Sequence, residues 1–462
     1  MLSKSMGGED LLLTSYRHRT TAISSPGRLN FSPEGWWGKV VAVLSWIFLA
    51  VCVVGLAFTV NAYRPLRLEP VAVPSFFAGW LTSELPVHHL VWQAVAAAVF
   101  IDEGALRGGP GWAALAVTAV SWAGLVGLAV QASRASTVVD DALRTGLGDD
   151  FRQHLGDVTS EDMPVIDRVR IALPLLLRHR DVEKIRSIDY AGDGARSHRL
   201  DLYRPRRPLH NAPVLLYIHG GAWMMGDKRE QGLPMIHHLA SRGWVCVTIN
   251  YRLSPRARFP DHLIDCKRAL AWVKENIAGY GGDPTFVAVS GGSAGGHLAA
   301  LVGLTAGDPS YQPGFEAADT SVAACLPFYG IYDFTNRDGL WRHGFGRFLE
   351  RLVMRTSLAA DPEAYRRASP IDQVHEGAPP FMVVQGANDT LVPVGEARAF
   401  CAALRGVCTS PVVYVELPGA QHAFEVFHSV RTAHVVQGAA DFLAFVHAGR
   451  RRAEVPAAPI GR

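Results

Sequence analysis

The sequence predicts an α/β fold, with a mostly parallel sheet covered by helices on both faces, preceded by a helical transmembrane region. Three observations support this prediction. β-type and helix-type runs alternate between residues 182 and 448. The first third of the chain contains long apolar stretches without charge. A serine flanked by glycines, Ser293, stands between a strand-like run and a helix-like run.

The composition limits the classes of protein to consider. The chain has 462 residues and a formal net charge of +3, so it lacks the strongly basic character of nucleic-acid-binding proteins. Six cysteines are too few for a disulfide scaffold in a chain of this length. Charged residues make up 19%, against the roughly 25% usual in soluble domains. The deficit is concentrated in the first third, which indicates a membrane as a partner.

The region 37–134 contains three candidate transmembrane helices, at about 40–60, 85–101 and 112–132. The first and third are uncharged and long enough to cross roughly 30 Å of hydrocarbon. The first begins too far from Met1 for a cleaved signal peptide, so we expect it to be retained. The middle segment is shorter and contains His88, His89 and Gln93. It leaves two alternatives open, a third crossing or an interfacial or buried hairpin.

The number of crossings decides on which side of the membrane the rest of the chain lies. The tail 1–36 carries four lysines and arginines, whereas the loop after the first helix carries two, Arg64 and Arg67. This bias favours a cytoplasmic location of the tail. The candidate helices then predict a protein of the cell membrane that crosses it more than once. Three crossings would then place the remaining chain outside the cytoplasm, and two would leave it inside.

Residues 135–181 are expected to form a linker and an amphipathic segment. The chain is polar from 137 to about 157, with the aspartates and glycines typical of a linker. The segment 163–177 is amphipathic and is followed by arginines. Two interpretations of it remain open: a helix that lies along the bilayer or over an active site, and a helix packed on the next domain.

Residues 182–448 are predicted to form one α/β domain, followed by a tail at 449–462. The expected strands are 185–190, 198–203, 214–219, 244–251, 286–290, 322–329, 381–385 and 412–417. The expected helices lie near 230–241, 261–279, 294–305, 394–404 and 424–447. The first two strands are close together and predict a hairpin at one edge, whereas the later apolar runs predict buried parallel strands. A cap-like insert at about 339–370 would lie above the carboxyl edge of the sheet, where active sites of such folds are found.

The segment Gly291-Gly292-Ser293-Ala294-Gly295 predicts a nucleophile elbow. Its serine lies on a sharp strand-to-helix turn, which exposes the hydroxyl near the start of the helix. Glycines are needed there because a Cβ would collide across so tight a bend. The pattern is weak by itself, but its position between a β-run and an α-run makes Ser293 the candidate nucleophile.

A serine nucleophile requires a base, and the base requires a carboxylate that orients it. In this type of fold the acid and then the histidine follow the serine along the chain, each after a late strand. Asp389 comes just after the strand 381–385 and a glycine turn, and His422 follows the strand 412–417 and Pro418-Gly419. Ser293, Asp389 and His422 are therefore the predicted catalytic residues.

The tetrahedral intermediate of acyl transfer requires hydrogen-bond donors for its oxyanion. The strand 214–219 ends in His219-Gly220-Gly221, where glycines let backbone N–H groups face a pocket. Gly220 and Gly221 are the predicted donors, together with Ala294, the residue after the nucleophile. His219 precedes the nucleophile in the chain and is expected to shape this loop rather than to act as the base.

Four residues are candidates to line the substrate pocket: Trp223 and Gly292 beside the predicted oxyanion loop and elbow, and Trp341 and Phe345 in the insert. The aromatic and aliphatic side chains of the insert suit an acyl group. Packing of a helix pair on the scaffold explains the same pattern equally well, so both interpretations stay open.

Together these motifs resemble the α/β-hydrolase superfamily, in its hormone-sensitive-lipase-like and carboxylesterase branch. The resemblance covers roughly 182–448 and includes the segments 219–221, 250–255, 259–260, 281–284, 291–295 and 369–370. It implies hydrolysis of carboxylic esters without a cofactor. The sequence departs from that branch at Ala222, where a third glycine is common, and at Gly292, where an acid is common. His-Gly-Gly-x-Trp, with Trp223, is also similar to kynurenine formamidase relatives.

The sequence therefore predicts a membrane-anchored serine esterase or lipase acting on acyl esters or lipids. An aryl-formamidase or an acyltransferase with the same triad is the alternative, and a non-catalytic hydrolase-like binding protein is a third. No cysteine has metal-ligand spacing, and no metal is expected. Cys401 and Cys408 flank a helix end, and the sequence leaves open whether they pair. The natural substrate and the oligomeric state are also left open.

Overall fold

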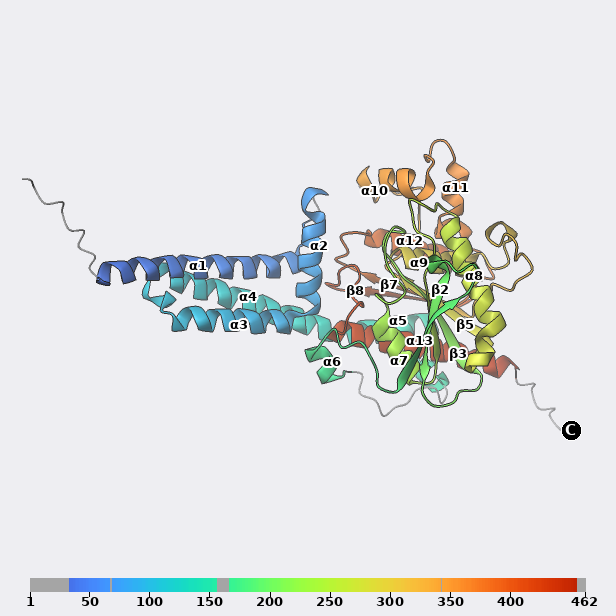
Figure 1. The fold of residues 1–462 in the computed structure, drawn as a ribbon, viewed down its shortest axis with the longest axis horizontal. Helices are drawn as coiled ribbons and strands as arrows, with labels where there is room; N and C mark the ends of the chain where they lie inside the picture. Colours follow the sequence, from blue (N-terminus) through green and yellow to red (C-terminus); the bar gives the residue numbers. More distant parts are fainter. Residues whose placement is uncertain (1–32, 67–68, 156–165, 342, 455–462) are drawn as a thin grey trace, which may run out of the picture.

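The computed structural model describes residues 33–66, 69–155, 166–341 and 343–454. The described chain forms an elongated bundle of helices and an α/β domain at one end of that bundle (Figure 1). Most of the expected tail 1–36, the first residues of the amphipathic segment 163–177 and the residues after 454 lie outside the described residues.

All eight expected strands form, within a few residues of their expected ends, and they make one sheet. They are β1 (Val182–Asp189), β2 (Arg199–Pro205), β3 (Ala212–Ile218), β4 (Val245–Ile249), β5 (Gly282–Gly292), β6 (Ala324–Phe328), β7 (Phe381–Gly386) and β8 (Val412–Leu417). Their order is β1-β2-β4-β3-β5-β6-β7-β8. The hairpin β1–β2 is antiparallel and pairs antiparallel with β4, and the remaining pairs are parallel. This is the α/β-hydrolase type of sheet that the sequence predicts.

Helices cover both faces of this sheet. They are α7 (Leu233–Ser241), α8 (Asp261–Asn276), α9 (Ala294–Leu304), α12 (Val394–Val407) and α13 (Val430–Glu454). The expected last helix, 424–447, is wrong at its start, because the chain from 421 to 429 is made of turns and bends rather than helix. These turns bring His422 and the residues after it over the carboxyl ends of the strands. The insert forms α10 (His343–Phe348), the π-helical turn η7 (Leu349–Met354) and α11 (Pro362–Arg367).

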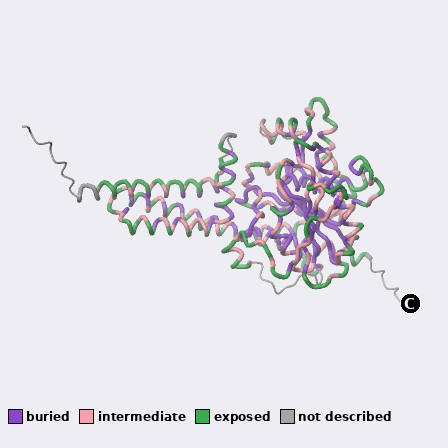
Figure 2. Tube along the Cα trace, viewed as in Figure 1, coloured by how far each residue is buried: buried purple, intermediate pink, exposed green. Residues whose placement is uncertain are grey.

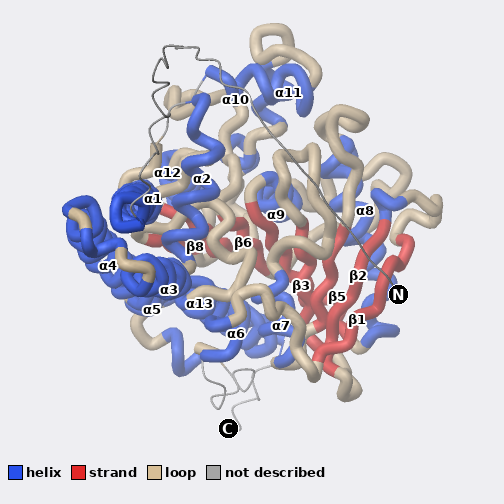
Figure 3. Tube along the Cα trace, turned by 60° about the vertical axis from the view of Figure 1, so that its left-hand side comes forward, coloured by secondary structure: helices blue, strands red, loops and turns tan. Residues whose placement is uncertain are grey.

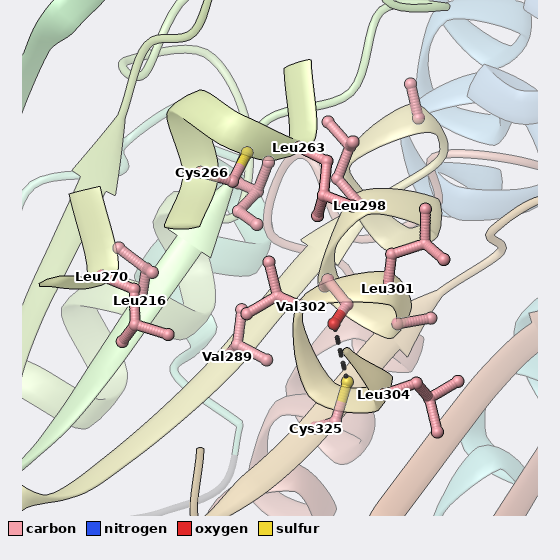
Figure 4. Packing of buried hydrophobic residues seen from close by; sticks show 14 of the residues in the cluster. Leu216, Leu263, Cys266, Leu270, Val289, Leu298, Leu301, Val302, Leu304 and Cys325 are labelled. Atoms are coloured by element: carbon pink, nitrogen blue, oxygen red, sulfur yellow. Dashed lines mark hydrogen bonds between the residues drawn. The ribbon is translucent and has the colours of Figure 1, made fainter. Parts of the chain in front are cut away.

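Figure 4 shows how α9, the helix after the elbow, is fixed in the core. Its residues Leu298, Leu301 and Val302 are fully buried with strand and α8 residues in one apolar cluster. The Cys325 thiol on β6 donates to the Ala299 carbonyl at 3.2 Å. Full burial of one such aliphatic side chain is worth about 1.5–3 kcal/mol. The start of α9, and with it the elbow, is therefore held by a rigid interior.

The N-terminal helices are α1 (Pro33–Tyr63), α2 (Glu69–Glu84), α3 (Pro86–Asp102) and α4 (Gly109–Ser133). Two described helical stretches, Lys39–Tyr63 and Gly109–Leu147, are long and apolar enough to cross a membrane. The chain bends by 94° between α2 and α3. If this bent pair counts as one span, the number of candidate spans among the described residues rises to three. Figure 2 shows exposed residues along the outside of this bundle and buried ones concentrated in the α/β domain.

The segment expected to be a linker contains a helix instead, α5 (Ala135–Leu147), which continues from α4. Its polar residues face outward, while Val139 and Leu143 are buried in the core of the α/β domain. A Cβ built on Gly146 would lie 2.7 Å from the Val413 side chain on β8, which shows how closely α5 approaches the sheet. The aspartates of this segment suggested a linker, but its buried residues Ala135, Val139 and Leu143 are spaced by four, as on one face of a helix.

The expected amphipathic helix 163–177 is mostly absent among the described residues. Only α6 (Arg168–Ala172) is helical, and turns and extended chain follow it. Leu173 and Leu175 are 57% and 76% exposed, so this segment is not packed on the domain as a helix. His88 at the start of α3 lies 3.1 Å from the Ala172 carbonyl, which places the segment beside the end of the bundle.

The bundle and the α/β domain meet at α2, which lies across the end of the bundle next to the domain (Figure 3). Arg431 of α13 donates to Glu84, and both side chains are buried. Ser429 donates to the other Glu84 oxygen at 2.8 Å. Asn388 donates to the Ala62 carbonyl of α1 at 3.1 Å. The contact is specific and polar at its centre, so the two parts form one unit.

Candidate active site

The elbow has the geometry expected for an exposed, strained serine. β5 ends at Gly292, α9 begins at Ala294, and Ser293 between them has φ 58° and ψ −122°. Such a conformation costs roughly 1–3 kcal/mol in a non-glycine residue and must be supported by its surroundings. The Ser293 N–H donates to the Phe328 carbonyl at 2.9 Å. A Cβ at Gly295 would lie 2.1 Å from the Ile218 carbonyl, so only glycine fits there.

Asp389 and His422 meet although 33 residues separate them in the chain. Asp389 follows β7, His422 follows β8, and His422 Nδ1 lies 2.7 Å from Asp389 Oδ2. The Leu391 and Val392 N–H groups donate to Asp389 Oδ1, both at 2.8 Å. Gln385 Nε2 donates to Oδ2 at 2.9 Å. The carboxylate is therefore held on every side, and with Nδ1 bound to it the histidine has Nε2 left for a reacting group.

Tyr329 connects the elbow to His422. Its ring centroid lies 4.5 Å from that of His422. A Cβ on Gly292 would lie 2.7 Å from the Tyr329 hydroxyl, so the elbow contacts the same side chain. Among the described contacts no hydrogen bond joins Ser293 Oγ to His422, and contacts of this kind commonly tighten only when substrate binds. The structure thus brings Ser293, Asp389 and His422 to one place at the carboxyl edge of the sheet.

The predicted oxyanion loop follows β3 and lies against the elbow. A Cβ on Gly220 would lie 3.1 Å from Ser293 Cβ. The Gly220 N–H, however, donates to Gln231 Oε1 at 2.7 Å, so this predicted donor is already occupied. Gly221 has φ 112°, where glycine alone is unstrained, and Ala294 is the first residue of α9, where backbone N–H groups lack helical partners. Gly221 and Ala294 are the predicted donors that stay available.

His219 is buried behind this loop. Its ring stacks on Tyr251 at 4.5 Å and its Nδ1 lies 2.7 Å from the Gly220 carbonyl. Burial lowers the pKa of His219, which disfavours its charged form. A neutral histidine here shapes the loop by packing.

The four candidate pocket residues are in two kinds of environment. Trp341 and Phe345 line a cavity of about 480 Å³ together with Asp389 and residues of α2. Gly292 lies under the Tyr329 ring. Trp223, in contrast, is 1% exposed and donates through Nε1 to His297 Nδ1 at 3.3 Å. Trp223 is therefore a core residue, and its backbone has a positive φ of 58°.

The described residues contain no group of three or more His, Cys, Asp or Glu side chains placed to hold a metal ion. All six cysteines are free thiols, including Cys401 and Cys408. Cys401 is buried and packed in the core, and burial raises the pKa of its thiol to about 12.

Comparison with known proteins gives a consistent result. The BD-FAE family model matches residues 200–404. A probable carboxylic ester hydrolase, LipM of Mycobacterium tuberculosis (strain H37Rv), is 42% identical over 428 residues, with 88% of this chain and 95% of LipM covered. The esterase LipQ of the same organism is 41% identical over 391 residues, covering 84% and 87% of the two chains.

The chain belongs to the carboxylesterase branch of the α/β-hydrolase superfamily. The esterase LipC of the same organism is 45% identical over 276 residues, covering 59% of this chain and 68% of LipC. The α/β domain makes up less than two thirds of the chain, so the 88% coverage against LipM includes much of the helical region as well. The helical region is therefore shared with at least one relative.

Several residues that contact the site in this α/β-hydrolase were missed in the sequence. Gln385 and Tyr329 are the last residues of the expected strands 381–385 and 322–329. This position marks the carboxyl edge of the sheet, so it could have identified both residues. Phe76 of α2 places its ring 6.3 Å from that of His422, with an edge-on geometry. The sequence did not predict this contact, because residues 71–83 are apolar and indicate only a membrane segment.

Glu425 is a buried acid next to the catalytic-site candidates of this α/β-hydrolase. It accepts hydrogen bonds from the hydroxyls of Tyr329 and Tyr217. Burial raises the pKa of Glu425 to about 7, because the hydrogen bonds from the tyrosines and the charge of nearby His422 offset only part of the lost solvation. The acid holds Tyr329 in place, and Tyr329 in turn supports the His422 ring.

Proposed function

We propose that this carboxylic ester hydrolase is a membrane-anchored serine hydrolase that cleaves acyl esters through Ser293, His422 and Asp389. The observation that carries the proposal is the short contact between His422 Nδ1 and an Asp389 carboxylate fixed by three further donors. A carboxylate in this position holds the imidazole in the tautomer that can accept a proton at Nε2. The strained elbow supports Ser293 as the nucleophile.

The proposed mechanism has two steps. Ser293 Oγ attacks the ester carbonyl carbon while His422 Nε2 accepts the hydroxyl proton, and the C–O bond to the alcohol breaks as His422 returns that proton to the leaving oxygen. Water then attacks the acyl carbon as His422 Nε2 takes one of its protons. The bond from the acyl carbon to Ser293 Oγ breaks as His422 returns that proton to Oγ, which releases the carboxylic acid and restores the serine. Gly221 and Ala294 donate to the oxyanion in both steps. Loss of one such donor typically lowers kcat roughly 10²–10³-fold.

The helical region supports anchoring by three antiparallel crossings. Ser45, early in α1, donates to the Ala105 carbonyl at 2.6 Å, whereas Ala62 at the other end of α1 contacts the α/β domain. The chain therefore leaves the domain end through α3, turns near Ala105 and returns through α4. With 17 residues, α3 is just long enough to cross, at about 1.5 Å per residue. A cytoplasmic N-terminus then places the α/β domain outside the cytoplasm.

The alternative of an aryl-formamidase or acyltransferase rests on the His-Gly-Gly-x-Trp motif and on the membrane context. Trp223 is enclosed by His297 and Phe334 in the core and supplies no substrate contact, which favours the esterase over the formamidase. A hydrolase-like binding protein would be expected to lack part of the triad. The presence of Ser293, Asp389 and His422, each after a strand of the sheet, supports a catalytic protein instead.

The test compares Ser293→Ala with Ser290→Ala in the full chain. Ser290 is a buried serine three residues earlier that donates to the Leu326 carbonyl at 2.7 Å, so it is a matched control outside the site. Hydrolysis of a p-nitrophenyl ester and labelling by a fluorophosphonate should fall at least about 10³-fold in Ser293→Ala. Ser290→Ala should retain both. Equal labelling of wild type and Ser293→Ala would contradict the assignment.

A further inference from the structure

α2 presents one face to the outside and the other to the active site. Val73, Phe77 and Leu81, spaced by four residues, are 55%, 50% and 40% exposed. Ala72 and Phe76 on the opposite face are buried. A helix with one exposed apolar stripe, lying across the end of a bundle of apolar helices, is placed to lie at a membrane surface. The bend of 94° between α2 and α3 produces this orientation.

The buried face of α2 reaches the proposed catalytic histidine. Phe76 contacts the His422 ring edge-on at 6.3 Å. One turn further along, Trp80 packs on Phe427, with ring centroids 5.1 Å apart. The buried pair Glu84–Arg431 fixes the end of the helix. α2 is therefore held against the segment that carries His422 along most of its length.

The cavity beside Asp389 lies between α2 and the insert. Ala72 and Val73 form one wall, and Trp341, Phe345 and Phe348 form the other. Trp341 is fixed by a hydrogen bond from its Nε1 to the buried Glu396. At about 480 Å³ the cavity is within the range of roughly 300–1,000 Å³ typical of small-molecule sites.

The lining of this cavity selects an apolar ligand. Asp389 is its one charged residue, and that carboxylate is already bound by His422 and by backbone N–H groups. Three further lining residues, Val73, Leu340 and Leu391, are apolar and 37–55% exposed, so the opening of the cavity is apolar as well. An apolar rim on an otherwise soluble domain marks contact with a lipid or a protein. Val73 belongs both to this rim and to the exposed stripe of α2.

We propose that α2 is a wall of the substrate site and that the cavity receives the acyl chain of a lipid ester from the bilayer, past Val73. This inference rests on the proposed function and adds its substrate class, a long-chain acyl ester resident in the membrane. The helical region then determines specificity as well as location. Phe76 would pack beside the reacting ester, next to His422.

The test uses a substitution in α2 that makes the cavity narrower. Val73→Trp adds bulk at an exposed position, and Leu81→Trp makes the same change on the same stripe at the far end of α2, away from the cavity. The full chain is reconstituted in phosphatidylcholine vesicles, and hydrolysis of p-nitrophenyl palmitate and p-nitrophenyl acetate is measured for each variant. Fluorophosphonate labelling gives the amount of folded enzyme.

The palmitate-to-acetate rate ratio should fall at least tenfold in Val73→Trp and stay within twofold of wild type in Leu81→Trp. Equal ratios in all three proteins, with normal labelling, would overturn the role of α2 while leaving the serine mechanism intact. If the ratio fell equally in both variants, the exposed stripe would act through membrane contact alone. That result would also overturn the role of α2 as a wall of the substrate site. Failure of the proposed function itself would appear separately, as undiminished activity of Ser293→Ala.

Discussion

The helical bundle and the α/β domain bury their apolar residues in opposite ways. In β3 every residue is buried, whereas only 22% of the most apolar window of the first candidate span is buried. Trp46 on α1 and Trp112 on α4 are each 63% exposed. The domain completes its own core, but the bundle leaves its outer surface for another apolar phase. The same substitution should therefore change stability or membrane insertion by different amounts in the two regions. The following comparisons test this expectation.

The largest expected effect is at the junction of the two regions. Arg431→Met removes the cation from Glu84 and leaves a buried carboxylate unpaired, which costs roughly 3–5 kcal/mol. We expect the full chain in detergent micelles to unfold at a much lower temperature than wild type. The double variant Glu84→Leu with Arg431→Met should recover most of this loss, because it removes both charges.

A surface ion pair provides the control for this prediction. Arg144→Met breaks the pair with Asp140, which has a contact distance of 2.8 Å and an arginine that is 43% exposed. Its effect should be no more than about 1 kcal/mol. If both arginine variants were equally stable, the junction would not be a specific contact.

The next effect compares one substitution in two surroundings. Val53 on α1 and Val407 on α12 are 49% and 50% exposed. Val53→Arg places a charge in the proposed membrane span and should cost roughly 2.5–3.5 kcal/mol of insertion free energy. Val407→Arg should be neutral to within about 0.5 kcal/mol. The amount of protein that resists carbonate extraction from membranes measures the difference, and equal amounts would place Val53 in water.

The last comparison depends on pH and concerns Glu425, the buried acid that accepts hydrogen bonds from Tyr329 and Tyr217. The pKa of Glu425 is raised from an ordinary value of 4.5 to about 7, so the folded state binds its proton more tightly than the unfolded state does. Stability should therefore fall as the pH rises from about 4.5 to 7, by at most about 1.4 kcal/mol per pH unit, and remain lower above 7. Glu425→Gln should remove the part of this decrease that Glu425 contributes, whereas Glu396, whose pKa burial also raises to about 7, keeps its own part. The two proteins are compared by thermal unfolding at pH 5 and pH 8, and parallel curves would contradict the prediction.

The sequence predicted the α/β domain well because its signals are local. Each strand is a short apolar run, and each residue of the predicted triad follows such a run at a glycine turn. The parallel sheet then brings these ends together, so the pairing of His422 with Asp389 follows from topology. The confirmed fold and ester hydrolase class depended on these same motifs.

What the sequence did not predict depends on contacts between distant segments. The Gly220 N–H is directed to Gln231, which lies outside the motif that suggested it as a donor. Trp223 packs in the core against His297 and Phe334, which are far from it in the sequence. The place of Phe76 beside His422 requires a right-angle bend and a docking of two regions, and neither has a sequence signature. The helix α5 was missed because its aspartates dominate the composition.

The continuous path from α4 into α5 has a further consequence. α5 carries the axis of the last apolar helix about 20 Å further, at roughly 1.5 Å for each of its 13 residues, and ends against β8. In the proposed membrane-anchored enzyme, a rigid helix of this kind would fix both the height and the tilt of Ser293 above the bilayer. The enzyme would then meet its substrate by diffusion in two dimensions, with each lipid arriving already oriented. Its rate would depend on the mole fraction of the ester in the membrane and not on its concentration in the surrounding water.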